Sequence, residues 1–261
     1  MRDARGKAEQ KPAARPRTPG TRPRGGAAHG GARRPPAAAP ARRVQRAPGP
    51  PPKRVRAILR ILRRLYPQVR TALEFRNPFE LLIATVLSAQ CTDERVNQVT
   101  PAFFARFPDA AALAGGTRDE IERLIYTTGF FRNKAKSLHG AAEALVARHG
   151  GRVPETLEEL VALPGIGRKT ANVILGSAFG LPGITVDTHV GRLARRLELS
   201  AADAPEKIET DLAGLLPRKE WTAISLRLIE HGRRVCLARK PRCTECALLP
   251  HCPSGSRLSP R

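Results

Sequence analysis

Helical periodicity dominates this chain from Lys53 onward and constrains its fold more than any other feature. In the first such segment, large apolar residues recur three or four positions apart, at Val55, Ile58, Leu59, Leu62 and Leu65. That spacing places side chains on one face of an α-helix. No segment shows the alternation of apolar and polar residues that is typical of a half-buried strand. We therefore expect an all-α protein with short loops.

Capping residues predict where several helices begin. Asn77 followed by Pro78 predicts a helix start, and the run from there to Gln90 is apolar on most faces, which indicates a buried central helix. Two capping boxes are predicted further on, by Thr117 with Glu120 and by Thr156 with Glu159. Further helices are expected at about residues 133–149, 171–179, 188–197, 205–216 and 220–235.

Residues 1–52 differ from the rest in composition. They consist mainly of Arg, Pro, Ala and Gly and hold 13 of the 46 Lys and Arg residues but 2 of the 23 Asp and Glu residues. Such a segment cannot bury enough apolar surface to offset its ordering entropy, so we expect a disordered basic tail. It has no apolar run of the kind found in a secretory signal, and no part of the chain predicts a membrane span. We expect a cytoplasmic protein.

The net charge is +23, and it stays positive when the tail is left out. A strongly basic balance says nothing about fold but favours polyanionic partners through steering and counterion release. Nucleic acid is the partner class that this charge predicts.

Two glycines separate two predicted helices in the segment Leu163-Pro164-Gly165-Ile166-Gly167-Arg168-Lys169. Without Cβ atoms, Gly165 and Gly167 allow a tight turn and close approach to a ligand. The N–H groups at the start of the second helix have no partner within it and favour an anion. An ordinary helix–helix turn would explain a bare Gly-x-Gly. The flanking Arg168 and Lys169 favour a clamp on a nucleic-acid backbone instead.

Lys169 has two interpretations. It is either a solvated phosphate contact or an amine nucleophile. The second interpretation rests on the helix N-terminus and Arg168, which place positive potential nearby and so favour the neutral amine. A neutral lysine can attack C1′ of a deoxyribose, and this reaction needs an acidic partner. Asp187 is the candidate partner, and it is also a good N-cap for the helix after it. We expect His189, two residues later, to contact phosphate rather than only to pack.

Four of the five cysteines lie near the C-terminus as Cys-x6-Cys-x2-Cys-x5-Cys, at Cys236, Cys243, Cys246 and Cys252. Without a secretory signal, clustered thiols are better explained as metal ligands than as disulfides. Structural zinc sites more often use two tight pairs, and here only Cys243 and Cys246 form one, so the spacing is compatible with zinc and with a [4Fe–4S] cluster alike.

Three motifs together resemble the endonuclease III family of iron–sulfur-containing helix-hairpin-helix DNA glycosylases. They are the segment 163–175 with Val186-Asp187-Thr188-His189, the segment Ser88-Ala89-Gln90-Cys91-Thr92-Asp93, and the cysteine pattern. The resemblance runs from about residue 53 to residue 252. It implies a bifunctional DNA glycosylase and abasic-site lyase for oxidised pyrimidines, with Lys169 as the Schiff-base lysine and Asp187 as the catalytic aspartate. The four cysteines would hold a [4Fe–4S] cluster.

The resemblance also implies two helical domains and a DNA-binding cleft between them. Residues 71–181 would form a six-helix barrel, and residues 53–70 with 182–261 would form the cluster domain. The partner would be double-stranded DNA bound by a monomer, with Gln90 filling the gap left by a flipped nucleotide. Phe130 stands where the family usually has a leucine and would intercalate in its place.

Two rivals remain on the sequence. The adenine-mismatch glycosylase of the same superfamily shares the hairpin, the aspartate and the cluster but lacks the lysine and carries a further C-terminal domain, whereas this chain has Lys169 and nine residues after Cys252. The other rival is a non-catalytic DNA-binding protein with zinc at the cysteines.

Overall fold

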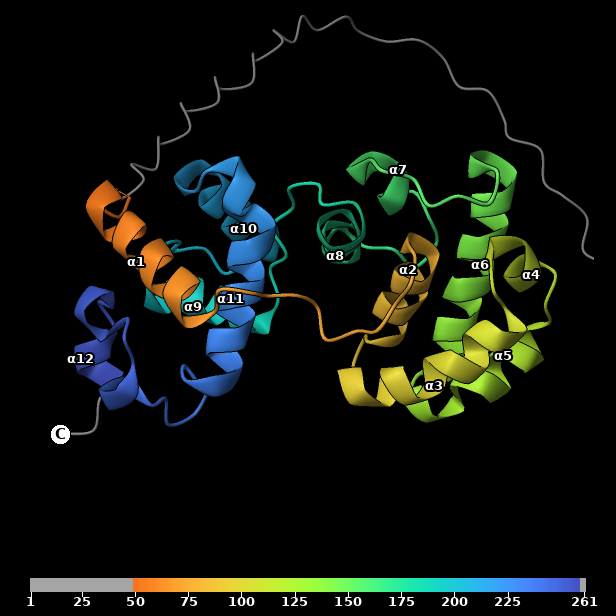
Figure 1. The fold of residues 1–261 in the computed structure, drawn as a ribbon, viewed down its shortest axis with the longest axis horizontal. Coiled ribbons are helices and arrows are strands. Elements are labelled where there is room, and N and C mark those ends of the chain that lie inside the picture. The colour runs from red at the N-terminus through yellow and green to blue at the C-terminus, as the bar shows by residue number, and fades with distance from the viewer. Residues whose placement is uncertain (1–48, 259–261) are drawn as a thin grey trace, which may run out of the picture. The chain divides into compact units, whose positions relative to one another are not determined.

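Residues 49–258 are described by the computed structural model, and within that range the chain forms helices and no strands (Figure 1). The predicted all-α class is confirmed. Residues 1–48 of the predicted basic tail lie outside the described range. The α-helices are α1 (Pro52–Leu65), α2 (Pro78–Leu87), α3 (Asp93–Arg106), α4 (Ala110–Ala114), α5 (Arg118–Ile125), α6 (Phe131–His149), α7 (Leu157–Val161), α8 (Arg168–Ala178), α9 (Thr188–Arg196), α10 (Pro205–Leu215), α11 (Trp221–Arg234) and α12 (Gly255–Leu258).

The first hydrophobic core is built around α2. Every residue of this helix after Pro78 is buried, and it packs against α3, α6 and α8. The predicted buried central helix is thus confirmed, and Asn77 caps it by accepting a hydrogen bond from the backbone N–H of Glu80. It ends at Leu87 rather than at Gln90, and Gln90 itself has a left-handed backbone with φ 53°. This core runs along the chain from Leu73 to Leu175.

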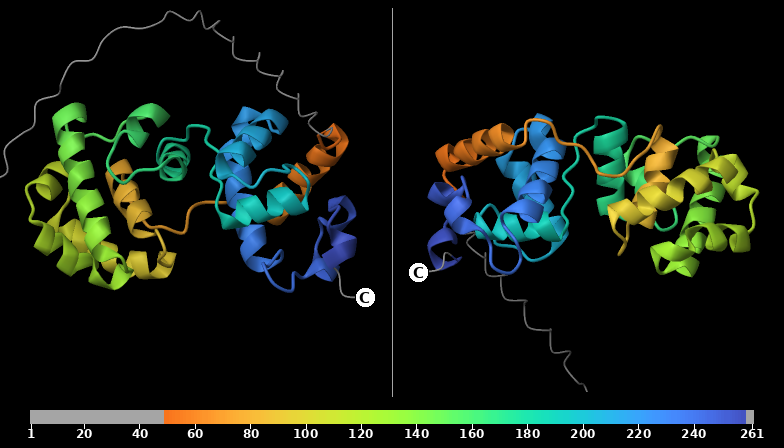
Figure 2. Two further views of the ribbon diagram at one scale, coloured as in Figure 1. Left: turned by 180° about the vertical axis from the view of Figure 1, so that it is seen from behind. Right: turned by 60° about the horizontal axis from the view of Figure 1, so that its bottom comes forward.

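The second hydrophobic core joins segments that are far apart in the sequence. The apolar face of α1 packs with residues from Ile184 to Leu248, and α9 lies beside α11 in both views of Figure 2. A side chain of α1 reaches across as well, since Arg54 donates from Nη1 to the backbone oxygen of Leu197 at 2.6 Å. The first core lies between residues 73 and 175, and the second joins α1 with residues 184–248. The domain boundaries near residues 70 and 181 stay a proposal.

None of the helices in residues 49–258 combines the length and the apolar character needed to cross a membrane.

Candidate active site

The glycine-containing turn connects α7 to α8. Gly165 has φ 76°, and a Cβ atom built there would lie 2.4 Å from Cβ of Ser137 on α6, so both its conformation and its packing require glycine. Gly167 is the N-cap of α8, and no side chain caps this helix. A Cβ atom at Gly167 would have nothing within 4 Å. The first turn of α8 is therefore open to an anion, as the sequence predicted.

The two cations after the turn have different surroundings. Lys169 is exposed, and within residues 49–258 its amine makes no hydrogen bond or ion pair. Arg168 forms a bidentate pair with Glu209 of α10, with Nε and Nη2 donating at 2.9 and 2.8 Å. Its pKa is raised, above all by that hydrogen bond. The carboxylate of Glu209 offsets much of the positive charge that the sequence assigned to this position, so the open helix N-terminus is the main source of positive potential beside Lys169.

Asp187 is the N-cap of α9, as predicted. Its Oδ1 accepts a hydrogen bond of 2.8 Å from the backbone N–H of Val190, and the residue is half-buried. Its segment is tied to α8 by Asn172, a buried residue whose side-chain amide donates to the backbone oxygen of Ile184 at 2.9 Å. Asn172 lies three positions after Lys169, and Ile184 lies three positions before Asp187. One hydrogen bond therefore fixes the helix that carries the lysine to the segment that carries the aspartate.

His189 lies against α11. A Cβ atom on Gly232 would approach Nδ1 of His189 to 2.8 Å, and Nη2 of Arg192 lies 3.0 Å from the same ring nitrogen. Arg192 also donates to the backbone oxygens of Cys236 and Gly232. The histidine therefore packs, and a contact from its ring to phosphate remains a prediction.

Gln90 and Phe130 belong to two exposed loops of the first core. Gln90 follows α2, and Phe130 precedes α6 with 63% of its surface exposed. Both have left-handed backbones, at φ 53° and φ 49°, although neither is a glycine. Such conformations persist only where the surrounding structure holds them, and they concentrate at functional sites.

The four C-terminal cysteines line one pocket, together with apolar residues, Arg196 and Arg242, and none of them is in a disulfide. Nη1 of Arg196 donates to Sγ of Cys236 at 3.2 Å. Burial is the main cause that raises the pKa of the Cys246 and Cys252 thiols, and the other thiols of the pocket add to it. In residues 49–258, no three His, Cys, Asp or Glu side chains lie close enough together to surround a single metal ion.

His231 lies beside this pocket, in contact with Cys246, and sequence reasoning missed it. It is buried in α11, and burial lowers its pKa to about 4, so its ring is neutral at pH 7. Nδ1 lies 3.0 Å from the hydroxyl of Tyr66, and Nε2 lies 3.4 Å from Sγ of Cys246. The available signal was its spacing, since Ile224, Leu228 and His231 form one buried helical stripe.

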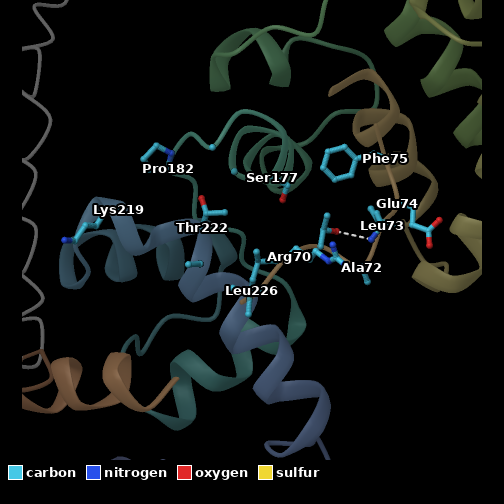
Figure 3. A pocket seen from close by; sticks show the side chains of 15 residues that line it. Arg70, Ala72, Leu73, Glu74, Phe75, Ser177, Pro182, Lys219, Thr222 and Leu226 are labelled. Carbon is cyan, nitrogen blue, oxygen red and sulfur yellow. Dashed lines mark hydrogen bonds between the residues drawn. The ribbon is translucent and has the colours of Figure 1, made fainter. Parts of the chain in front are cut away.

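A separate cavity of about 910 Å³ lies among the segment 69–75, the end of α8 and the start of α11 (Figure 3). Arg70, Glu74, Ser177, Lys219 and Thr222 are among its lining residues. None of the predicted catalytic or DNA-contacting residues lines it, so the size of a cavity does not mark the candidate active site here.

Comparison with known proteins agrees with this geometry. Residues 83–218 match the family described as HhH-GPD superfamily base excision DNA repair protein. The chain is 57% identical over 204 residues to endonuclease III of Synechocystis sp., covering 78% of this chain and 93% of the relative. It is 41% identical over 191 residues to endonuclease III of Escherichia coli, covering 73% and 90%.

A solved structure gives the same result. A trapped endonuclease III–DNA covalent intermediate, described as an estranged-adenine complex, is 39% identical and superposes with a TM-score of 0.76, covering 79% of this chain and 98% of that chain. The predicted resemblance and the two-domain helical class are thereby confirmed. The chain belongs to the endonuclease III family, within the HhH-GPD superfamily of base excision DNA repair proteins.

Proposed function

We propose that this enzyme is a bifunctional DNA glycosylase and abasic-site lyase that removes oxidised pyrimidines and then cleaves the strand. The observation that carries the proposal is the exposed, unpaired amine of Lys169 in the first turn of an uncapped helix. Asp187 is held in place by its N-cap hydrogen bond from Val190, and its segment is tied to that helix through Asn172. The solved endonuclease III structure, a covalent intermediate with DNA, supports a residue that bonds to the substrate.

Lys169 is the nucleophile in this proposal. Its neutral amine attacks C1′ of the damaged nucleotide, the bond from C1′ to the base breaks, and the base leaves with the electron pair of that bond and a proton. Asp187 stabilises the positive charge that develops on the sugar and accepts a proton, and its N-cap hydrogen bond keeps it in place. The lysine nitrogen then forms a double bond to C1′ as the bond from C1′ to O4′ breaks, and the proton held by Asp187 moves to O4′, which leaves an open-chain Schiff base. Loss of a C2′ proton and breakage of the bond from C3′ to oxygen cleave the strand 3′ to the site.

The duplex must be opened before this chemistry, because C1′ of a stacked nucleotide is out of reach. Gly165, Gly167 and the start of α8 would hold the DNA backbone, with Arg168 and His189 as further phosphate contacts. Arg168 would then exchange part of its pair with Glu209 for phosphate. Gln90 would fill the gap left by the flipped nucleotide, and the exposed ring of Phe130 would separate a base step.

The cysteine pocket fits a [4Fe–4S] cluster by the chemistry of its donors. Cys236, Cys243, Cys246 and Cys252 supply four thiol sulfurs to one largely apolar pocket, and such clusters are held by four thiolates. A bound cluster would cross-link the loop that they delimit. Arg196 and His231, which contact two of the sulfurs, would orient the ligands. Purified protein should contain iron and acid-labile sulfide in equal amounts, and zinc in place of both would contradict this assignment.

Borohydride trapping on duplex DNA containing thymine glycol tests the reaction. Wild-type protein should form a covalent adduct after reduction of the Schiff base, and Lys169→Ala should form none. Lys207→Ala, which removes another exposed lysine, is the matched control and should trap like the wild type. Absence of a wild-type adduct, or full trapping by Lys169→Ala, would refute the proposal.

We propose further that the enzyme acts as a monomer on chromosomal DNA in the cytoplasm.

A further inference from the structure

Lys134 is a buried lysine that the proposed chemistry does not use. It lies on α6 with 5% of its surface exposed, and no carboxylate within residues 49–258 pairs with it. Instead, its Nζ donates to the backbone oxygens of Leu87 and Thr128, each at 2.8 Å. Buried lysines are rare, and one held by carbonyl groups alone is costly to bury. We therefore look for the role of this lysine in its hydrogen bonds to the two carbonyls.

The two carbonyls belong to the two loops that are proposed to enter the DNA. Leu87 is the last residue of α2, three positions before Gln90, and Thr128 lies two positions before Phe130. The ammonium group therefore joins the base of one loop to the base of the other. Burial is the main cause that lowers the pKa of Lys134, and the neighbouring Cys91, beside Gln90, opposes that shift.

The backbone of Lys134 strengthens this connection. Its N–H donates to the backbone oxygen of Phe130 at 3.1 Å, as the first helical hydrogen bond of α6, so this one residue bonds to Phe130, Thr128 and Leu87. Gly129, between Thr128 and Phe130, has φ 70° with open space around it and gives the loop no rigidity of its own. The left-handed conformations of Gln90 and Phe130 need a neighbouring contact to hold them. Lys134 provides a contact that the two loops share.

We propose that Lys134 is a positioning residue that sets the separation of Gln90 and Phe130, so that both side chains can enter the duplex around one flipped nucleotide. This rests on the proposed function, in which those two side chains act on DNA. A lysine that only stabilised the fold would lower activity by the same factor whether or not Gln90 and Phe130 were present. A positioning residue acts through them, and its effect disappears when they are removed.

A double-mutant cycle separates these two roles. Lys134→Met keeps the aliphatic length but removes the donors, and we expect it to slow single-turnover base release from thymine-glycol duplex by about tenfold, the effect of losing hydrogen bonds from a charged donor. In a Gln90→Ala, Phe130→Ala background, the same change should alter the rate by less than about twofold, which is the limit of additivity for independent sites. Lys136→Met, at an exposed position on the same helix, is the matched control and should match wild type in both backgrounds.

The other outcomes of the cycle distinguish failure of the positioning role from failure of the proposed function. An equal loss of rate in both backgrounds, or no loss in either, would overturn the positioning role while wild-type trapping left the proposed function standing. If the wild type does not trap at all, the proposed function has failed instead. Should Lys134→Met not fold, as judged by its far-ultraviolet circular dichroism, Lys134→Gln keeps a donor group and a polar tip and undergoes the same cycle.

Discussion

Replacing Gly165 by alanine tests how the turn before α8 is built. The backbone there has φ 76°, which alanine adopts at a cost of about 1–2 kcal/mol. The added Cβ would also lie 2.4 Å from Cβ and 2.6 Å from Oγ of Ser137, which is closer than atoms approach without displacement. Overpacking of this kind costs about 1–3 kcal/mol. Together, the two effects should lower the free energy of unfolding by about 2–5 kcal/mol.

Thermal unfolding followed by circular dichroism measures this loss. For a protein of this size, each kcal/mol shifts the midpoint by about 2–4 °C, so Gly165→Ala should unfold roughly 5–20 °C earlier than wild type. Gly167→Ala is the matched control, because Gly167 has φ −88° and open space around it. Its midpoint should change by no more than the effect of a surface substitution, about 0.5 kcal/mol.

The second variant pair isolates the steric contribution. Ser137→Gly removes the atoms that the new Cβ would meet, so Gly165→Ala with Ser137→Gly should recover the packing loss and keep only the cost of the left-handed backbone. The Ser137→Gly single variant corrects for the lower helix propensity of glycine. Equal midpoints for Gly165→Ala and Gly167→Ala, or no recovery in the double variant, would refute the reasoning.

Three further predictions follow from contacts at the candidate active site and from the tail. Asp187→Asn should keep the N-cap of α9, because asparagine caps as well as aspartate, and should leave the thermal midpoint unchanged while base release slows by about a hundredfold or more; unchanged activity would remove Asp187 from the chemistry. Asn172→Ala should unpair the carbonyl of Ile184, cost about 1–3 kcal/mol by thermal unfolding and reduce borohydride trapping, whereas the exposed Asn133→Ala should do neither. Deleting residues 1–48 should flatten the dependence of DNA affinity on salt concentration, and an unchanged slope would exclude a DNA-binding tail.

Local chemistry explains which helices could be predicted. Thr117 and Glu120 form both hydrogen bonds of the predicted capping box, and Asp187 caps its helix, because these motifs depend only on residues a few positions apart. Helix α3 was not predicted. It contains Pro101, which disfavours a helix interior, but Phe103 and Phe104 are buried in the first core and tertiary packing outweighs the local preference.

In the candidate site too, the features that depend on local sequence could be predicted, and the contacts between distant residues could not. Gly165, Lys169 and Asp187 could be predicted because their roles follow from a turn, a helix start and a cap. Glu209, the partner of Arg168, lies 41 positions away, and the carbonyl of Leu87 lies 47 positions from Lys134. No spacing rule brings such groups together, since only the packing of whole helices does so. The distant contacts therefore had to come from the structure.

Helix α1 has a consequence for how the polypeptide assembles. It is synthesised before the other helices of the described range, but its apolar face packs against residues 184–248, and Arg54 reaches a carbonyl 143 positions further on. The first core, from Leu73 to Leu175, needs neither α1 nor the last quarter of the chain. During translation, that core can close while α1 still exposes Ile58 and Leu62 to the ribosome surface and to chaperones. The emerging chain therefore passes through a stage in which the residues of α1 have been synthesised but the residues that cover their apolar face have not.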